Sequence, residues 1–483
     1  MSSRFTVYYG PVINPKSLTL YETIPSCLLA VSSTGNIEWI AADITASHVH
    51  ETIIQKGCTD FDVVRLGSGE FIIPGFIDTH THACQFSAIG TGYDKELLDW
   101  LADLTYPGEA RFSDPDFARR IYPGVVRRTL NCGTTACCYY GTLHLEATKI
   151  LANVAHAMGQ RAFVGKCNMD QSAPQYYIEP SPSESIQATK ALLEHIQTLD
   201  HSPAGEPLVH PILTPRFAIS CSPELLKELG KLAAANPSLA IQTHVSENKE
   251  EVKEVHRLFG CDSYAGVYDT YHLLRENTIL AHGIYLTDDE VKLLKERNVG
   301  ISHCPGSNFH VNSGVARVGE WLDQGIKVGL GTDVSGGYSP SILTAVQHAS
   351  IASKVIAMEA RSGSHRNGHG HDHPHQATVQ FSNKQLPIAT LFYLATLGGA
   401  NVCCLQQRVG SFGPGKAFDA LVVSVRNDTG NPGVWGVTPS ESEDVSEDVM
   451  KGWLEQFLFC GDDRNIRRVI VQGKVVGGLD FTE

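Results

Sequence analysis

The 483-residue sequence lacks several features that would assign it to a familiar class of protein. No uninterrupted apolar run reaches the roughly 18 residues that span a bilayer. The N-terminal stretch MSSRFTVYYGPVINP has no basic segment followed by an apolar one, which a secretory signal requires. Positive charge is scarce, since 38 Lys and Arg face 52 Asp and Glu and give a formal net charge of −14. The composition therefore predicts a cytoplasmic protein whose main partner is neither nucleic acid nor a membrane.

Cysteine is plentiful but lacks the spacing that binds metal or forms a redox pair. The 13 cysteines are an odd number, they are scattered, and no two of them form a CxxC motif. This absence excludes a zinc ribbon and a thioredoxin-like motif. We expect reduced thiols that are mostly buried, as in a cytosolic protein.

The two ends of the chain share a β-rich pattern of alternating apolar residues and glycines. The predicted strands and hairpins are Phe5–Ile13, Cys27–Ala41, Val63–Ile73, Asp419–Val425 and Ile466–Val476. In Val63–Ile73 we expect a hairpin that turns at Gly67–Gly69, and Ile466–Val476 should turn at Gln472–Lys474. We expect both ends, residues 1–73 and 409–483, to form one small β-sandwich domain.

Residues 74–408 alternate short apolar strands with longer helical stretches, which is the pattern of βα units on a parallel sheet. Ser222 is placed to cap a helix over Ser222–Ala235, and Thr287 with Glu290 forms a capping box. Eight strands alternating with helices favour a closed (β/α)8 TIM-like barrel over an open doubly wound sheet. The strand candidates begin near Ile72, Gly133, Arg161, Pro211, Ala240, Thr278, Gly300 and Lys327.

A histidine-rich segment, His365–His375, interrupts this pattern within residues 362–378. Its Gly, Asn and Pro residues predict an exposed insertion rather than a helix or strand. Its five histidines could buffer metal weakly. Because nothing rigid would hold their imidazoles in ligand geometry, a metal-storage role is disfavoured.

Polar side chains recur where the predicted barrel strands end, which is the rim where barrels of this kind hold their active sites. His80 and His82 end the first strand, and alternate residues on a strand share a face. Taken singly, each polar residue has a structural alternative, such as a core imidazole or an aspartate that caps a turn. Their joint position at strand ends predicts one metal site. The residues at the other strand ends are His244, Glu247, His282 and Asp333.

Three histidines and one carboxylate suit Zn²⁺ or, less often, a similar first-row metal. Such an ion lowers the pKa of bound water to about 7, so the sequence predicts hydrolytic attack at an electron-poor carbon. Glu247 is the candidate carboxylate for moving protons. His282 could stabilise oxyanion charge, with direct ligation left open, and Asp333 could accept the water proton as well as ligate.

A binuclear site is the structural rival. Related hydrolases often bridge two metals with a carboxylated lysine at the end of strand four. Here the fourth strand offers Arg216, and Lys166 falls on the third. A single metal is therefore favoured.

The motif PGFIDTHTH (Pro74–His82), the His244 and His282 strand ends and Gly331–Asp333 resemble the amidohydrolase superfamily. Gly413–Ala420 is similar to the return of such enzymes into their terminal β domain, with Phe418 as a departure. Finer motifs resemble the guanine deaminase family, although Cys84 stands where that family commonly has Ser. These motifs are His82–Gln85, Thr214–Phe217, His244–Glu247, Thr332–Gly337 and Ala395–Ala400.

The resemblance implies that guanine and water become xanthine and ammonia, as a step of purine catabolism, in a homodimeric enzyme. It implies one Zn²⁺ per subunit, with zinc-bound hydroxide attacking C2 while Glu247 protonates N3 and helps to expel ammonia. The ligands that it implies are His80, His82, His244 and Asp333.

Three more residues are predicted to contact the substrate, in addition to Glu247, His282 and Asp333. Arg216 is a permanent cationic donor that could hold O6, and Gln85 has both donor and acceptor atoms for a ring edge. Phe217 offers a flat apolar contact, with core packing as its alternative.

Two other functions compete with this prediction. One is another aminohydrolase or chlorohydrolase of the superfamily, acting on a pterin, a triazine or another purine. A pocket for adenine would not need a cationic donor such as Arg216 to hold O6. The other is a non-catalytic scaffold, which should have lost ligands, whereas all four and Glu247 are present.

Overall fold

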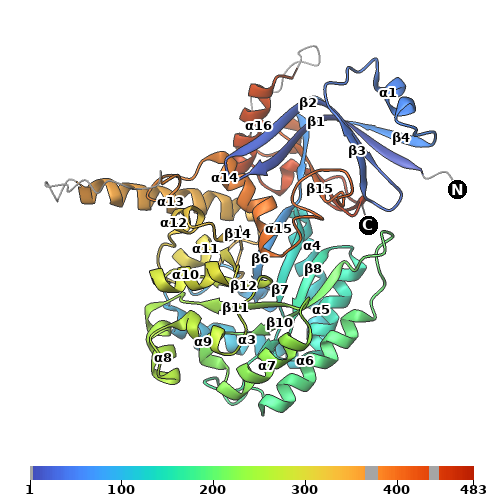
Figure 1. Ribbon diagram of the computed structural model, residues 1–483. Coiled ribbons are helices and arrows are strands. Elements are labelled where there is room, and N and C mark those ends of the chain that lie inside the picture. Colours follow the sequence, from blue (N-terminus) through green and yellow to red (C-terminus); the bar gives the residue numbers. More distant parts are fainter. Residues whose placement is uncertain (1–3, 365–378, 435–444, 483) are drawn as a thin grey trace.

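The structure, a computed structural model, describes residues 4–364, 379–434 and 445–482. Two sheets organise these residues, one built from both ends of the chain and one from its middle (Figure 1). No helix in these ranges is long and apolar enough to cross a membrane. The histidine-rich segment His365–His375 lies outside the described residues.

The larger sheet is a ring of parallel strands in the order β14-β13-β12-β11-β10-β8-β7-β6, and short β9 pairs with β10. Backbone hydrogen bonds close the ring where β6 meets the segment after β14. Asp333 N donates to His80 O at 2.8 Å, and His82 N donates to Val334 O at 3.1 Å. The predicted (β/α)8 barrel is confirmed. Its strands are β6 (Phe76–His82), β7 (Thr134–Tyr140), β8 (Arg161–Gly165), β9 (Cys167–Asn168), β10 (Val209–Pro215), β11 (Ala240–Val245), β12 (Thr278–His282), β13 (Gly300–His303) and β14 (Lys327–Leu330).

Helices cover the outside of this ring (Figure 1), so that strands such as β6 and β7 are buried along their whole length. The predicted caps are confirmed, because Ser222 accepts a hydrogen bond from Leu225 N and the Thr287–Glu290 capping box is present. The helices after β7 are α5 (Leu145–Ala157), α6 (Pro182–Gln197), α7 (Pro223–Ala235), α8 (Lys249–Phe259), α9 (Tyr264–Thr270), α10 (Asp288–Glu296), α11 (Pro305–His310), α12 (Val318–Asp323), α13 (Ile342–Ser364), α14 (Ile388–Tyr393) and α15 (Gly399–Val402).

The segment between β6 and β7 contains α2 (Leu97–Trp100), α3 (Tyr106–Ala110) and the long helix α4 (Pro115–Asn131). Asp114 caps α4 by accepting a hydrogen bond from Asp116 N, and Pro115 suits its first turn. The segment before α4 lies against the barrel mouth and supplies pocket residues that are described below.

The second sheet has the order β17-β16-β15-β5-β1-β2-β3, with β4 paired to β1. Antiparallel pairing of β5 with β15 joins the two ends of the chain. The predicted β domain from both termini is therefore confirmed, and the boundaries at residues 73 and 409 stay predictions. Its elements are β1 (Phe5–Ser17), β2 (Leu20–Val31), β3 (Ile37–Ala41), α1 (Val49–Gln55), β4 (Phe61–Arg65), β5 (Glu70–Pro74), β15 (Ala420–Ser424), α16 (Glu447–Cys460), β16 (Ile466–Val471) and β17 (Lys474–Gly477).

Two details of the predicted strands are wrong and one is confirmed. The strand expected from Ile72 to His82 is two strands in different sheets, β5 and β6. The hairpin expected over Val63–Ile73 is absent, because β4 pairs in parallel with β1 while β5 pairs with β15 and β1. The hairpin expected over Ile466–Val476 is present as β16 and β17.

Gly75 explains the break between β5 and β6. A Cβ built on this residue would lie 2.1 Å from Thr135 Oγ1, so the backbone passes too close to β7 for any side chain. The apolar pattern runs unbroken through this point because both strands are buried. Most of the 13 cysteines are buried, as predicted.

Candidate active site

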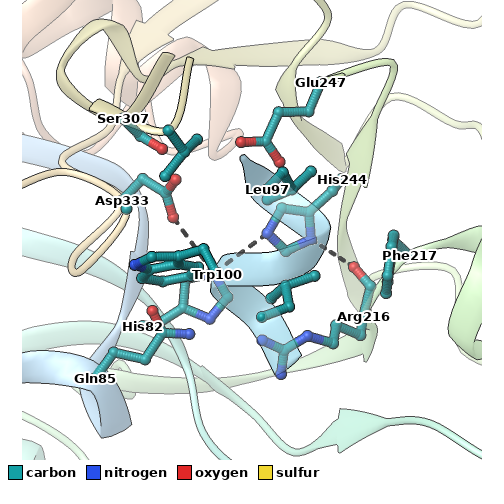
Figure 2. A pocket seen from close by; sticks show the side chains of 13 residues that line it. His82, Gln85, Leu97, Trp100, Arg216, Phe217, His244, Glu247, Ser307 and Asp333 are labelled. Carbon is teal, nitrogen blue, oxygen red and sulfur yellow. Dashed lines mark hydrogen bonds and ion pairs between the residues drawn. The ribbon is translucent and has the colours of Figure 1, made fainter. Parts of the chain in front are cut away.

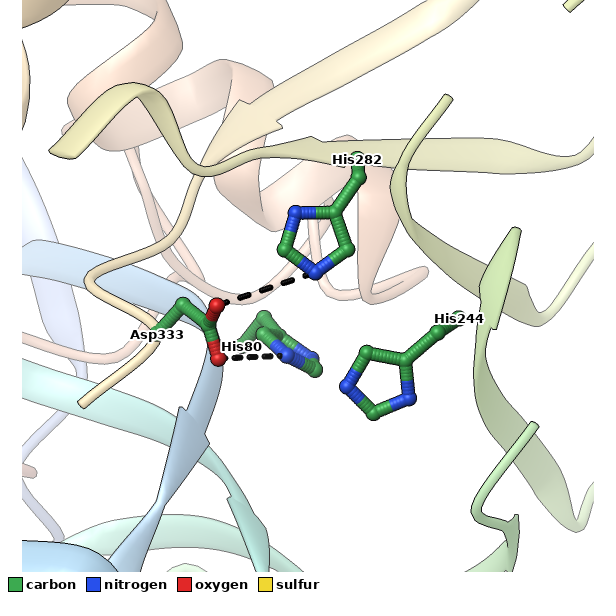
Figure 3. A group of neighbouring side chains, drawn as sticks. All are labelled: His80, His244, His282 and Asp333. Carbon is green, nitrogen blue, oxygen red and sulfur yellow. Dashed lines mark ion pairs between the residues drawn. The ribbon is translucent and has the colours of Figure 1, made fainter. Parts of the chain in front are cut away.

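The predicted metal ligands meet at the carboxyl end of the barrel strands. His80, His244, His282 and Asp333 are buried, and each offers a ligand atom within 4.8 Å of those of the others (Figure 3). His82 adjoins this group, with its Nε2 3.2 Å from His244 Nε2 and 3.4 Å from Asp333 Oδ1. The structure thus brings all five side chains together, but the group whose ligand atoms lie mutually close contains His282, whose ligation was left open, and has the predicted ligand His82 beside it.

Hydrogen bonds orient two of the imidazoles. His244 Nδ1 lies 2.5 Å from the backbone oxygen of Arg216, and His282 Nδ1 lies 3.0 Å from Asn308 Oδ1. A carbonyl oxygen only accepts, so Nδ1 of His244 carries the proton and its Nε2 keeps a free lone pair. Histidines that bind metals are held in this way by a partner on the other ring nitrogen.

The backbone turns sharply where these strands end. Ser246, His282 and Asp333 have φ angles of 48°, 74° and 46°, in the left-handed region. Non-glycine residues there cost about 1–3 kcal/mol each and cluster at functional sites. In this barrel, the turns aim side chains from β11, β12 and the segment after β14 at one point.

The ionisation of the cluster suits a cation. Burial lowers the pKa of His80 and His244, and it lowers that of His82 to about 4, so these imidazoles are neutral at pH 7. Burial opposes ionisation of Asp333, but its contacts with His80 prevail and hold its pKa well below the usual range. Neutral imidazoles with one carboxylate form the donor set of a zinc site.

Two buried nitrogens also point to a bound cation. Nε2 of His80 and Nε2 of His282 make no hydrogen bond within the described part of the chain, although Asp333 oxygens lie 3.0 and 3.7 Å away. A buried polar atom without a partner costs about 1–3 kcal/mol. A cation among these atoms would remove that cost, so the residues present fit a metal ion.

Glu247 lies beside the cluster without belonging to it. Its Oε2 is 3.4 Å from His282 Nε2. Burial, and then the negative charge of Asp333, raise the pKa of Glu247 well above its usual value, which favours the protonated carboxyl. The Glu251 carboxylate accepts hydrogen bonds from the N–H groups of Glu247 and Asn248 at 2.8 and 3.1 Å. The turn before α8 therefore holds Glu247 in place.

A pocket opens directly onto this cluster (Figure 2). The predicted substrate contacts Gln85, Arg216 and Phe217 line it, as do Glu247 and Asp333, whereas the predicted contact His282 is not among its lining residues. The lining thus combines polar side chains with apolar ones. The lining residues are His82, Gln85, Leu97, Trp100, Leu101, Arg216, Phe217, His244, Glu247, Ser307, Val311, Asp333 and Gly336.

Sequence reasoning missed the contribution of the segment between β6 and β7. Leu97 and Trp100 in α2 line the pocket, and Glu109 in α3 pairs with Arg216 at 2.7 Å. None of the three follows a predicted strand, so the strand-end rule could not find them. The only available signal was that a buried Arg216 needs a counter-charge, which does not say where in the chain that charge lies.

Comparison with known proteins agrees with this geometry. The sequence model of the amidohydrolase family matches residues 71–476. A probable guanine deaminase of Schizosaccharomyces pombe is 41% identical over 98% of this chain and 84% of its own. The guanine deaminase of Dictyostelium discoideum is 39% identical, over 97% and 98%. The crystal structure of guanine deaminase from C. acetobutylicum with bound guanine has a TM-score of 0.82 at 31% identity, covering 98% and 99% of the two chains. The chain therefore belongs to the amidohydrolase family.

Proposed function

We propose that the protein is a metal-dependent guanine deaminase, which hydrolyses guanine to xanthine and ammonia. The observation that carries this proposal is that a buried group of imidazoles and one carboxylate shares a pocket with a wall of hydrogen-bond donors, Arg216 and Gln85. Similarity to guanine deaminases over nearly the whole chain supports the choice of substrate.

The proposed cofactor is one Zn²⁺ per subunit, held by His80, His82, His244 and Asp333. The donor set, the lowered pKa values of the three histidines and the spacing of His82 from His244 and Asp333 support this set. When bound, such an ion makes hydroxide available near neutral pH. We assign His282 to contact with water and substrate, because its Nε2 faces both Glu247 and Asp333.

Glu247 is the proposed proton carrier. Its raised pKa favours the protonated form that a proton donor needs, and it lines the pocket where the ring would lie. In the proposed reaction Glu247 gives its proton to N3 while hydroxide attacks C2. The resulting carboxylate takes the proton of the new C2 hydroxyl and passes it to the amino group, so that the bond between C2 and the amino nitrogen breaks and ammonia leaves. Glu247 regains its proton from the next water, which supplies hydroxide for the next turnover. His282, 3.4 Å away, fixes the carboxyl and stabilises negative charge that develops beside it.

Different residues of the pocket contact different parts of the ring. Arg216 donates to O6, which draws electron density away from C2 and favours attack there. Phe217 offers its face to the ring, and Leu97 and Trp100 exclude water from the same space. Excluding water strengthens each electrostatic contact inside the pocket.

The test combines metal analysis with ammonia release. We expect about one zinc per chain by elemental analysis, loss of activity after chelation and recovery on adding Zn²⁺ back. Among guanine, adenine, 8-oxoguanine, cytosine and a pterin, guanine should be the fastest substrate. Faster turnover of another compound would overturn the substrate while leaving hydrolysis intact, and no ammonia from any of them would overturn the enzyme class.

The wider setting is inferred from the family resemblance. We infer a homodimer that acts in purine catabolism in the cytoplasm. Light scattering on the purified protein tests the dimer, and imaging of the tagged full chain tests the location.

A further inference from the structure

The carboxylate of Glu109 accepts hydrogen bonds from two polar residues that line the pocket, Arg216 and Gln85. It lies in α3 and is fully buried. Arg216 donates from Nη1 to Oε2 at 2.7 Å and from Nη2 to Oε1 at 3.1 Å. Gln85 Nε2 donates to Oε1 at 2.7 Å, and Tyr177 OH donates to Oε2 at 2.6 Å. An ionised carboxylate has about four acceptor sites, so these partners fill it.

The charge on this carboxylate is built into the fold. Burial disfavours ionised Glu109, but the guanidinium of Arg216 outweighs burial and keeps the pKa of Glu109 below its usual value. The aromatic ring of Tyr106, also in α3, lies 5.3 Å from Arg216 Cζ. One short helix thus holds the guanidinium by its edge and by its face.

The amide of Gln85 has only one orientation that satisfies its neighbours. Its Oε1 accepts a hydrogen bond from Ser335 N at 3.0 Å, while its Nε2 donates to Glu109. A flipped amide would set oxygen against the carboxylate and NH₂ against the N–H of Ser335, so both contacts would become repulsive. Figure 2 shows the amide nitrogen of Gln85 turned toward Arg216. The second N–H of that nitrogen remains for a ligand.

We propose that Glu109 is a positioning residue for specificity, because it makes Gln85 and Arg216 both present N–H groups to the pocket. Such a wall selects a ring edge that accepts hydrogen bonds, as O6 and N7 of guanine do. A ring with an amino group at position 6 would turn donors toward donors, and the unpaired groups would penalise it. This inference rests on the proposed function and adds the residue that sets the polarity of its pocket.

A comparison of two purine substrates isolates the effect of the group at position 6. Guanine and 2,6-diaminopurine carry the same 2-amino group that hydrolysis removes, and they differ in an oxo or amino group at position 6. The quantity to measure is the ratio of kcat/KM for guanine to kcat/KM for 2,6-diaminopurine. Loss of metal or of folded protein lowers both constants together, so a purely structural role would leave the ratio unchanged.

We expect the unaltered protein to favour guanine by about 100-fold or more, and Glu109→Gln to reduce that ratio by about tenfold or more, since an amide at 109 lets Gln85 rotate. Glu109→Asp, which keeps the charge but cannot reach both partners, should shift the ratio in the same direction and serves if Glu109→Gln does not fold. Tyr177→Phe is the matched control. It removes one donor to Glu109 and leaves those from Gln85 and Arg216, so the ratio should stay within about threefold.

The outcomes separate this inference from the function on which it rests. An unaltered protein that releases no ammonia from guanine overturns the proposed function and this inference with it. An active protein whose ratio is the same in a folded, metal-loaded Glu109 variant overturns the inference alone. A ratio that falls as far in Tyr177→Phe as in Glu109→Gln also overturns it, because the polarity of the wall would then not depend on the contacts to Gln85 and Arg216.

Discussion

Two buried arginine–carboxylate pairs lie at opposite ends of the barrel strands. Arg216 and Glu109 meet at the carboxyl end, where the pocket opens. Arg161 begins β8 at the other end, and its Nε and Nη2 donate to Asp419 at 2.9 and 3.2 Å. All four side chains are nearly inaccessible to solvent. The two pairs are alike in chemistry and burial.

They differ in what surrounds them. Arg161 also donates to Gln472 Oε1 at 3.2 Å, and Asp419 accepts from Gln472 N at 2.8 Å, so this pair joins the barrel to the terminal sheet. Arg216 instead lines the pocket beside Gln85. A buried ion pair by itself is weak evidence for function, because it can serve the fold alone. Because Arg216 lines the pocket, its pair with Glu109 belongs to the site, whereas the pair of Arg161 with Asp419 holds two parts of the fold together.

The largest effect is expected from removing a ligand at the carboxyl end. His80→Ala should lose its metal and more than about 1,000-fold in kcat, since a catalytic ion contributes several kcal/mol. Elemental analysis and ammonia release measure both losses. A variant that kept full metal content and rate would remove His80 from the site.

Glu247→Gln should keep the metal but lower kcat by about 100- to 10,000-fold, which is the range of general acid–base catalysis. Its melting temperature should change little, because the amide has the same shape. Activity and metal content, measured on one sample, test whether kcat falls while the metal is retained. A near-normal rate would contradict the proton-carrier role and leave the zinc proposal standing.

Asp419→Asn tests the other end of the barrel. It leaves the Arg161 charge buried without its counter-charge, so the free energy of unfolding should fall by about 3–5 kcal/mol. Urea unfolding measures this loss. For the folded fraction, kcat/KM should stay within about twofold, since the pair faces no ligand. A large fall in kcat/KM would show that the Arg161–Asp419 pair is coupled to the pocket at the other end of the barrel.

Arg216→Met tests the ion pair at the pocket. Hydrogen bonds to charged groups contribute about 1.5–3 kcal/mol, so kcat/KM for guanine should fall by about 10- to 150-fold. Stability should fall as well, because Glu109 loses its counter-charge. Unchanged kcat/KM for guanine would show that the O6 assignment is wrong.

Thr287→Ala should give the smallest effect. It removes the cap of α10, on the outside of the barrel, and should cost about 1 kcal/mol of stability. Kinetic constants should match those of the unaltered protein. A change in kcat would contradict this expectation and show that the outer helices influence the site.

Features that depend on local pattern could be predicted from the amino-acid sequence. The period of apolar residues located the barrel strands, and the residues that follow them, from His80 to Asp333, meet at one rim because parallel strands end on the same side. The caps at Ser222 and Thr287 were also predictable, since capping is local chemistry over three residues.

Features that depend on contact between distant segments could be identified only in the folded chain. The break at Gly75 is hidden in the sequence because the residues on both sides of it, Phe71–Ile77, are buried and largely apolar, and the close approach of Thr135 reveals it. The pairing of Glu109 with Arg216 joins residues 107 positions apart and follows no periodic pattern. A buried charge requires a partner, but only the folded chain determines which residue supplies it.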